Sequence, residues 1–327
     1  MPEEIGFNIE VYAKTDVGLV RSGNEDNFLV LNLSTAETWT PDLVLGEAPP
    51  TMTRFAQGHY GTVLAVTDGM GGALAGEVAS RLAVESVRDR MLELQASSAY
   101  SKFDFNERLR LAVELANLHI HYESLSHAEY SGMGATFTAL GLFGATGFFA
   151  QVGDSRAYVF RGGTARQITR DQSLVGQLVE AGHLTEEEAE QHTYKNVILQ
   201  ALGASPYINV AVNKLPLRNG DVILLCSDGL SNKIRGEEMM RVIEEAGSLP
   251  NGCDALVKVA NQRGGEDNIT VMMARVTGDR LQGVESKPEG DAGPQDWNIE
   301  TIQRDPGLPH EIEPDLLDGE EDTLPEA

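Results

Sequence analysis

Apolar residues follow two different periods along this chain, and the two kinds of segment do not alternate regularly. Strands are predicted, from runs of apolar and β-branched residues, over 7–15, 27–31, 62–67, 135–142, 147–152, 155–160, 164–168, 210–215, 221–226 and 269–273. Helices are predicted, from apolar residues at helical spacing, over 73–94, 106–124, 173–191, 236–246 and 252–262. The pattern predicts an α+β fold in which helices cover antiparallel sheets.

Two stretches lack either period. Residues 33–61 contain Pro41, Pro49 and Pro50 with little alternation, which predicts an inserted loop between two strands. Residues 278–327 are rich in Glu, Asp, Pro and Gly, which predicts a disordered acidic tail. One folded domain is therefore expected over 7–277.

Composition narrows the range of partners and of locations. The chain has 50 acidic and 25 basic residues, a formal charge of -25, which argues against nucleic acid or an anionic membrane as the main partner. Its two cysteines, Cys226 and Cys253, make neither a disulfide framework nor a zinc site. No segment approaches the roughly 20 apolar residues of a membrane span, and the N-terminus lacks the features of a signal peptide. We expect a soluble, cytoplasmic protein.

Four aspartates stand where an apolar strand meets a turn. Asp68 and Asp228 each close a predicted strand before a glycine, Asp154 follows a third strand, and Asp267 precedes the last one. Each alone could be an ordinary turn residue. Carboxylates at the rim of a core are costly unless a cation compensates them. Without a nearby Cys/His cluster, the expected cation is a hard metal, Mg²⁺ or Mn²⁺.

Six short motifs then make the chain recognisable, because they occur together and in order. They are Arg21–Asn27 (RSGNEDN), Thr67–Gly72 (TDGMGG), Gly134–Thr136 (GAT), Val152–Arg156 (VGDSR), Ser227–Leu230 (SDGL) and Glu266–Asn268 (EDN). In this order and spacing they resemble the metal-dependent protein phosphatases of the PP2C (PPM) family over residues 12–276. The resemblance implies a four-layer αββα sandwich, two central antiparallel β-sheets flanked by helix pairs, with metals at one end.

The resemblance also implies metal ligands. Asp68 bridges two Mn²⁺ or Mg²⁺ ions, the carbonyl of Gly69 adds a ligand, and Asp228 and Asp267 complete the opposite sides. Asp154 resembles the residue that, in bacterial members, helps hold a weaker third ion. The glycine is expected to let the backbone turn its carbonyl inward.

Catalytic roles follow from the same resemblance. Asp26 and Glu25 are expected to hold metal-bound waters, including the attacking one. Arg21 is expected to grip the substrate phosphate through its planar guanidinium. Simpler alternatives remain for three of these residues: Arg21 as a surface arginine, Glu25 as a solvated neighbour of Asp26, and Asp154 as a turn cap or the partner of Arg156.

One position departs from the eukaryotic pattern. Met70 stands where many eukaryotic members have a histidine that is proposed to protonate the leaving alcohol. Methionine cannot transfer a proton, and bacterial members often have it here, so the chain is identified as a bacterial-type member. His183 and His192 lie in the charged stretch 172–203, which resembles the family's flap, and exposed flap histidines are the expectation for both.

The function that the resemblance implies is hydrolysis of phosphoserine and phosphothreonine in proteins by a metal-bridging water or hydroxide. Phosphorylated proteins and a cognate Ser/Thr kinase are the expected partners, and the protein is expected to be a monomer. The alternative is a non-catalytic PP2C-like module that binds phosphoproteins. Loss of metal carboxylates would mark such a module, and this chain has them all.

Overall fold

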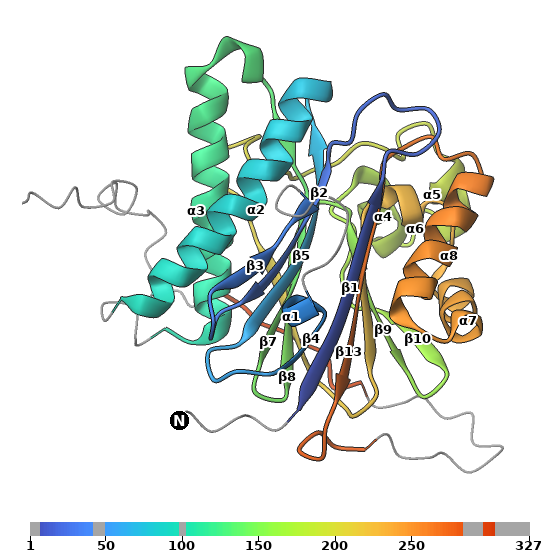
Figure 1. Cartoon of the computed structure of the whole chain (residues 1–327). Helices are drawn as coiled ribbons and strands as arrows, with labels where there is room; N and C mark the ends of the chain where they lie inside the picture. Colours follow the sequence, from blue (N-terminus) through green and yellow to red (C-terminus); the bar gives the residue numbers. More distant parts are fainter. Residues whose placement is uncertain (1–6, 42–49, 98–102, 284–296, 305–327) are drawn as a thin grey trace, which may run out of the picture.

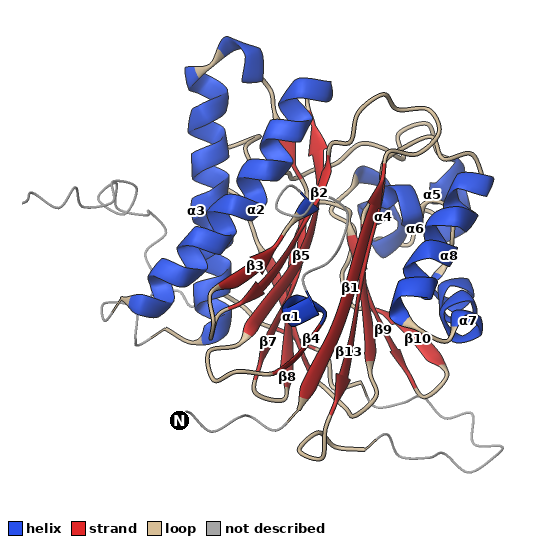
Figure 2. Cartoon of the chain, viewed as in Figure 1, coloured by secondary structure: helices blue, strands red, loops and turns tan. Residues whose placement is uncertain are grey.

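The computed structural model describes residues 7–41, 50–97, 103–283 and 297–304, and its strands form two sheets that pack face to face (Figures 1 and 2). The six-stranded sheet has the order β10-β9-β12-β13-β1-β4, with bounds Thr164–Gln167, Arg156–Arg161, Val222–Cys226, Ile269–Thr277, Asn8–Asp16 and Arg54–Ala56. The eight-stranded sheet has the order β14-β11-β8-β7-β5-β2-β3, with bounds Glu300–Thr301, Ala211–Pro216, Thr146–Val152, Phe137–Phe143, Thr62–Met70, Asp26–Asn32 and Glu37–Trp39, and β6 (Gly134–Ala135) pairs with β5.

Helices cover both outer faces of the sandwich (Figure 2). The long pair α2 (Ala73–Ala96) and α3 (Phe105–Ser126) packs on the eight-stranded sheet, and α7 (Gly236–Ala246) and α8 (Leu249–Gln262) pack on the six-stranded sheet. The shorter helices are α1 (Pro50–Thr53), α4 (Leu174–Glu180), α5 (Glu186–Gln191), α6 (Asp228–Ser231) and the 3-10 turn Ala128–Tyr130. The predicted α+β sandwich is confirmed. Among the described residues, no helix is both long enough and apolar enough to cross a bilayer.

Strand alternation explains why three apolar layers form. On β5, Val63 and Ala65 face α2 and α3, whereas Leu64 and Val66 face the other sheet. Successive side chains of a strand point to opposite faces, so a strand that is apolar throughout must be covered on both. All seven residues of β2 are likewise buried. The central strands are therefore packed on both faces close to the end of the sheet where Asp26 begins β2 and Asp68 lies near the end of β5.

The stretch predicted as one helix over 173–191 is two helices. Gly182, with φ of 72°, lies between α4 and α5 in the left-handed region that interrupts a helix. A capping box begins α5: Thr185 accepts from the backbone N–H of Glu188, and Glu188 accepts from the backbone N–H of Thr185.

The insertion at 33–61 differs from the predicted loop. It contributes β3, α1 and β4, and it buries Trp39 and Met52 in the apolar layer between the sheets. Residues 42–49 lie outside the described part. Since β2 and β5 pair from Asn32–Thr62 at one end to Asp26–Asp68 at the other, the insertion joins them at the end remote from Asp26. The described parts of the insertion do not cover the predicted site.

The predicted disordered tail is wrong for residues 297–304. There β14 pairs with β11, and the buried Arg110 donates to the carbonyl oxygens of Val210 at 2.9 Å and Ile302 at 2.8 Å. The Trp297 ring lies 4.9 Å from the guanidinium carbon of Arg161 and packs against the layer between the sheets. Long-range contacts of this kind leave no local period in the sequence. Residues 284–296 and 305–327 lie outside the described part.

Ending the chain at residue 296 is expected to lower the free energy of unfolding by about 3 kcal/mol. The change removes Trp297, Ile299 and Ile302, which are partly buried against the two apolar layers of the larger sheet. Urea denaturation measures the change. The pairing of Asp26 with Asp68 is expected to persist at temperatures where the shortened protein is folded, because β14 lies at the sheet edge, away from β5 and β2. An unchanged unfolding midpoint would contradict the structural role of this segment.

Candidate metal centre

Carboxylates from both sheets meet at one end of the sandwich. Asp26 at the start of β2 lies directly opposite Asp68 near the end of β5. From the other sheet, Ser227 follows β12 and donates its hydroxyl to Oδ2 of Asp26 at 2.7 Å. Asp228 is the next residue and begins α6. Three of the predicted site residues are thus brought together across the two sheets.

Asp267 joins the same end through a different set of contacts. It lies two residues before β13, and its Oδ2 accepts from Nη2 of Arg21 at 2.9 Å. The same guanidinium lies 4.0 Å from a carboxylate oxygen of Glu25. Both Arg21 and Asp267 are partly exposed, so this ion pair is a weak one. Arg21 is therefore at the carboxylate site, where it neutralises part of the negative charge.

The glycines after Asp68 and Asp228 are required by close packing. A Cβ on Gly69 would lie 2.0 Å from the carbonyl oxygen of Gly76, and one on Gly229 would lie 1.9 Å from that of Asn268. Gly69 does not have positive φ. A backbone turn was the expected reason for glycine at this position. The structure gives a steric reason instead, because the first turn of α2 packs directly on the backbone of β5.

Withdrawal from water makes the charged forms of these carboxylates unfavourable. It raises the pKa of Asp26 to about 7, and the neighbouring Asp228 and Asp267 act in the same direction, against hydrogen bonds from Thr270 and Ser227. Burial and like charges also raise the pKa of Asp68 and that of Asp228. Without a cation, these carboxylates keep their protons to a higher pH than ordinary aspartates do.

Two oxygen atoms in this cluster indicate which kind of ligand it suits. Oδ1 of Asp26 and Oδ1 of Asp228 are buried and have no hydrogen-bond partner within the described ranges. Buried polar atoms are normally paired, and an all-oxygen donor set suits Mg²⁺ or Mn²⁺. In the same ranges no three Asp, Glu, His or Cys side chains form a ready-made ligand set for a metal ion, and Oδ2 of Asp267 accepts from Arg21. The residues fit a hard ion that keeps several waters, as Mg²⁺ does.

Asp154 is affected by burial and by like charge in the same way as the other aspartates of the cluster. Burial raises its pKa to about 7, with a contribution from Asp228. The predicted alternative partner, Arg156, is bound to Asp171 by Nε at 2.9 Å and Nη2 at 2.6 Å. Arg156 therefore does not need Asp154 as its partner.

Two residues that received no role from the sequence position the site. Asn268 is buried and donates to the carbonyl oxygens of Val17 and Gly23, while its Oδ1 accepts from the backbone N–H of Glu25. It fastens the loop that holds Arg21 to the start of β13. Ser227 orients Asp26 and also accepts from the backbone N–H of Thr270 at 2.9 Å. Asn268 follows Asp267 and Ser227 precedes Asp228, both of them predicted ligands. This adjacency in the sequence was the available signal for their positioning role.

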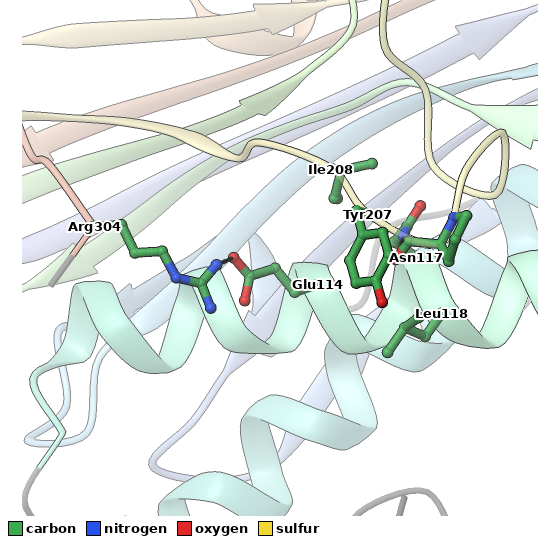
Figure 3. Close-up of a pocket in the computed structure, with 7 residues that line it drawn as sticks. Glu114, Asn117, Leu118, Tyr207, Ile208 and Arg304 are labelled. Carbon is green, nitrogen blue, oxygen red and sulfur yellow. Dashed lines mark hydrogen bonds and ion pairs between the residues drawn. The ribbon is translucent and has the colours of Figure 1, made fainter. Parts of the chain in front are cut away.

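A small hollow lies elsewhere, between α3 and the loop before β11 (Figure 3). Its volume is about 50 Å³, and Arg304 forms an ion pair with Glu114 at one end of it. Tyr207 and Ile208 approach from the loop. None of the predicted site residues lines this hollow.

Comparison with known proteins decides the family. The family model described as protein phosphatase 2C matches residues 52–261. The chain belongs to the protein phosphatase 2C family. Within that family, it is 34% identical over 260 residues to the serine/threonine phosphatase stp of Listeria welshimeri, an alignment that covers 80% of this chain and 93% of that one. It is 37% identical over 212 residues to the protein phosphatase PhpP of Streptococcus pneumoniae, covering 65% and 85%.

Solved structures of the phosphatase 2C family agree with the fold. The catalytic domain of the phosphatase PstP in complex with two manganese ions aligns with a TM-score of 0.65 and 30% identity, covering 83% of this chain and 99% of that one. With these relatives and the family match, the chain is a protein-serine/threonine phosphatase of the bacterial PP2C (PPM) type. The family and the enzyme class expected from the motifs, a protein-serine/threonine phosphatase, are confirmed.

Proposed function

We propose that this phosphatase hydrolyses phosphoserine and phosphothreonine in proteins at two Mn²⁺ or Mg²⁺ ions. The observation that supports it most directly is the pair of buried, unpartnered oxygens on Asp26 and Asp228 beside Asp68. Arg21 pairs with Asp267, whereas Asp26, Asp68 and Asp228 form no ion pair with a described side chain and need an external cation. The manganese complex of the similar PstP domain supports the choice of ion.

The ligands would be the side chains of Asp68, Asp228 and Asp267 and the carbonyl oxygen of Gly69, with Asp154 serving a weaker third site. When bound, the ions would neutralise the phosphoryl oxygens and lower the pKa of the water that attacks phosphorus. Attack by hydroxide forms one P–O bond, breaks the bond to the serine or threonine oxygen, and releases phosphate.

The other residues act around that reaction. Asp26, held by Ser227, is placed to accept a hydrogen bond from the attacking water, and Glu25 lies beside it. Arg21 would exchange its bond with Asp267 for the substrate phosphate, which its guanidinium fits as two parallel N–H donors. Met70 offers no proton to the leaving alcohol. That proton comes from water, which favours acidic leaving groups such as aryl phosphates.

The partners of this reaction are phosphorylated proteins and the Ser/Thr kinase that supplies them. The decisive assay follows release of p-nitrophenol from p-nitrophenyl phosphate, and of phosphate from a phosphothreonine peptide, with Mn²⁺, Mg²⁺ or EDTA. Turnover is expected with either metal, with loss in EDTA and at least about 10²-fold lower kcat for Asp228→Asn. A folded protein that binds the phosphopeptide without turnover under any condition would instead support the non-catalytic binding module.

A further inference from the structure

We infer that this phosphatase selects substrates whose phosphorylated residue is flanked by bulky apolar side chains, an inference that rests on the proposed function and deepens it. Six exposed apolar residues belong to three segments that border the carboxylate end, and we call them the apolar rim: Leu19, Val20, Leu74, Tyr194, Val197 and Leu199. Their exposed fractions run from 40 to 68%. They are six of the twelve large apolar residues that are exposed in the described part of the chain.

The first part of the rim is the loop between β1 and β2, drawn in dark blue at the top of Figure 1. Leu19 and Val20 precede Arg21, the residue proposed to bind the phosphate. The backbone N–H of Leu19 donates to the carbonyl oxygen of Gly265 at 2.7 Å, two residues before Asp267. The loop is therefore fixed beside the site, and the Leu19 side chain lies against Gly265, where an added Cβ would come within 3.0 Å of its Cγ.

The second part is the start of α2. Gly71 and Gly72, with φ of 115° and 92°, turn the chain from Gly69 into the helix. A Cβ on Gly76 would lie 1.9 Å from Oε2 of Glu25, so this first turn touches the site itself. Leu74 belongs to that turn and is exposed.

The third part is the returning side of the flap. The backbone N–H of Leu199 donates to the carbonyl oxygen of Gln172 at 2.8 Å, and that of Gln172 donates to Gly153, the neighbour of Asp154. Three residues after Leu199, Leu202 pairs with Ala135, which in turn pairs with Gly69. This segment is thus fixed on one side to the neighbour of Asp154 and on the other to the strand that pairs with Gly69. The backbone N–H of Val197 donates to the carbonyl oxygen of Tyr194 at 3.1 Å, so Tyr194 belongs to the same segment.

The position of these three segments indicates which kind of substrate the apolar rim favours. Each of these segments is bonded to, or touches, a residue beside the site, so a phosphorylated side chain at Asp68 and Asp228 has its flanking residues next to the rim. Burial of apolar surface there stabilises the complex, whereas polar flanks would lose hydration without a partner. The net charge of -25 alone would predict a preference for basic flanks instead.

Three phosphothreonine peptides of equal length, with leucine and valine, serine, or arginine flanks, distinguish these preferences. The leucine and valine peptide is expected to have about a tenfold higher kcat/KM than the serine peptide. In the paired variants Leu19→Ser with Val20→Ser, and Val197→Ser with Leu199→Ser, this ratio is expected to fall toward one. Tyr60→Ser, an exposed apolar residue at the opposite end of the sandwich, should retain the wild-type ratio.

Activity on p-nitrophenyl phosphate, which has no flanks, separates the inference from the proposed function. Metal-dependent turnover of this compound with equal kcat/KM for the leucine and serine peptides would overturn the rim inference and leave the proposed function intact. A preference for the arginine peptide that survives in the rim variants would overturn it in favour of charge selection. Absence of turnover on every substrate would overturn both.

Discussion

Asp68→Asn is expected to lower kcat for metal-dependent hydrolysis by about 10³-fold or more, and at the same time to raise the melting temperature of the metal-free protein. Activity falls because an amide provides no negative charge for the ions that Asp68 is proposed to bridge. Stability rises because the variant removes one of several carboxylates that withdrawal from water and mutual repulsion make unfavourable. The backbone hydrogen bond from Asp68 to the Thr136 hydroxyl, at 3.0 Å, does not involve the altered group.

The two readouts together distinguish a metal ligand from a turn residue. Differential scanning calorimetry in EDTA and then in Mn²⁺ is expected to show a large stabilisation of the wild type by the metal and little for the variant. Glu245→Gln, which removes one exposed negative charge from α7, controls for net charge. If Asp68→Asn kept its metal-dependent turnover, or melted lower than the wild type in EDTA, Asp68 would be an ordinary structural residue.

In EDTA, the melting temperature of the wild type is expected to fall by about 5–10 °C as the pH rises from 4 to 8. Asp26, with a pKa of 3.8 unfolded and about 7 in the folded protein, favours folding while it is protonated. Its contribution is fully present below the unfolded value and is lost as the pH rises through about 7. Asp154 changes in the same direction.

Divalent metal should reverse this trend, because the ion compensates the charges that the protein cannot. We expect Mn²⁺ to raise the melting temperature strongly at pH 8 and little at pH 5, where protons occupy the same carboxylates. Asp26→Asn should flatten the profile in EDTA, whereas Glu245→Gln should only shift it. A melting temperature in EDTA that rises between pH 5 and 8 would show that the cluster does not control stability.

Much of the fold could be predicted because the central strands are apolar throughout. Leu64 and Val66 belong to one layer, and Val63 and Ala65 to the next, so the run 62–67 had to be buried on both faces. The approach of Asp26 to Asp68 follows from the antiparallel pairing of two such strands. The motifs then supplied the family, which periodicity alone could not.

What could not be predicted depends on contacts between residues far apart in the sequence. Only the folded chain shows that Arg21 pairs with Asp267, and that Asn268 holds the loop before Glu25. The segment around β14 is held by Trp297 and by Arg110, from another part of the chain. Gly69 was assigned a conformational reason where the structure has a steric one, because α2 contacts it only after folding.

The carboxylate site takes Asp26 and Asp68 from one sheet and Asp228 and Asp267 from the other. The separation between these two pairs is set by the thickness of the apolar layer between the sheets, which includes Phe149 and Met272. Residues remote from the carboxylates therefore set the distance between the two pairs. Substitutions in that layer are expected to change the distance between these two pairs, so the metal preference of the proposed site can evolve while its proposed ligands stay the same.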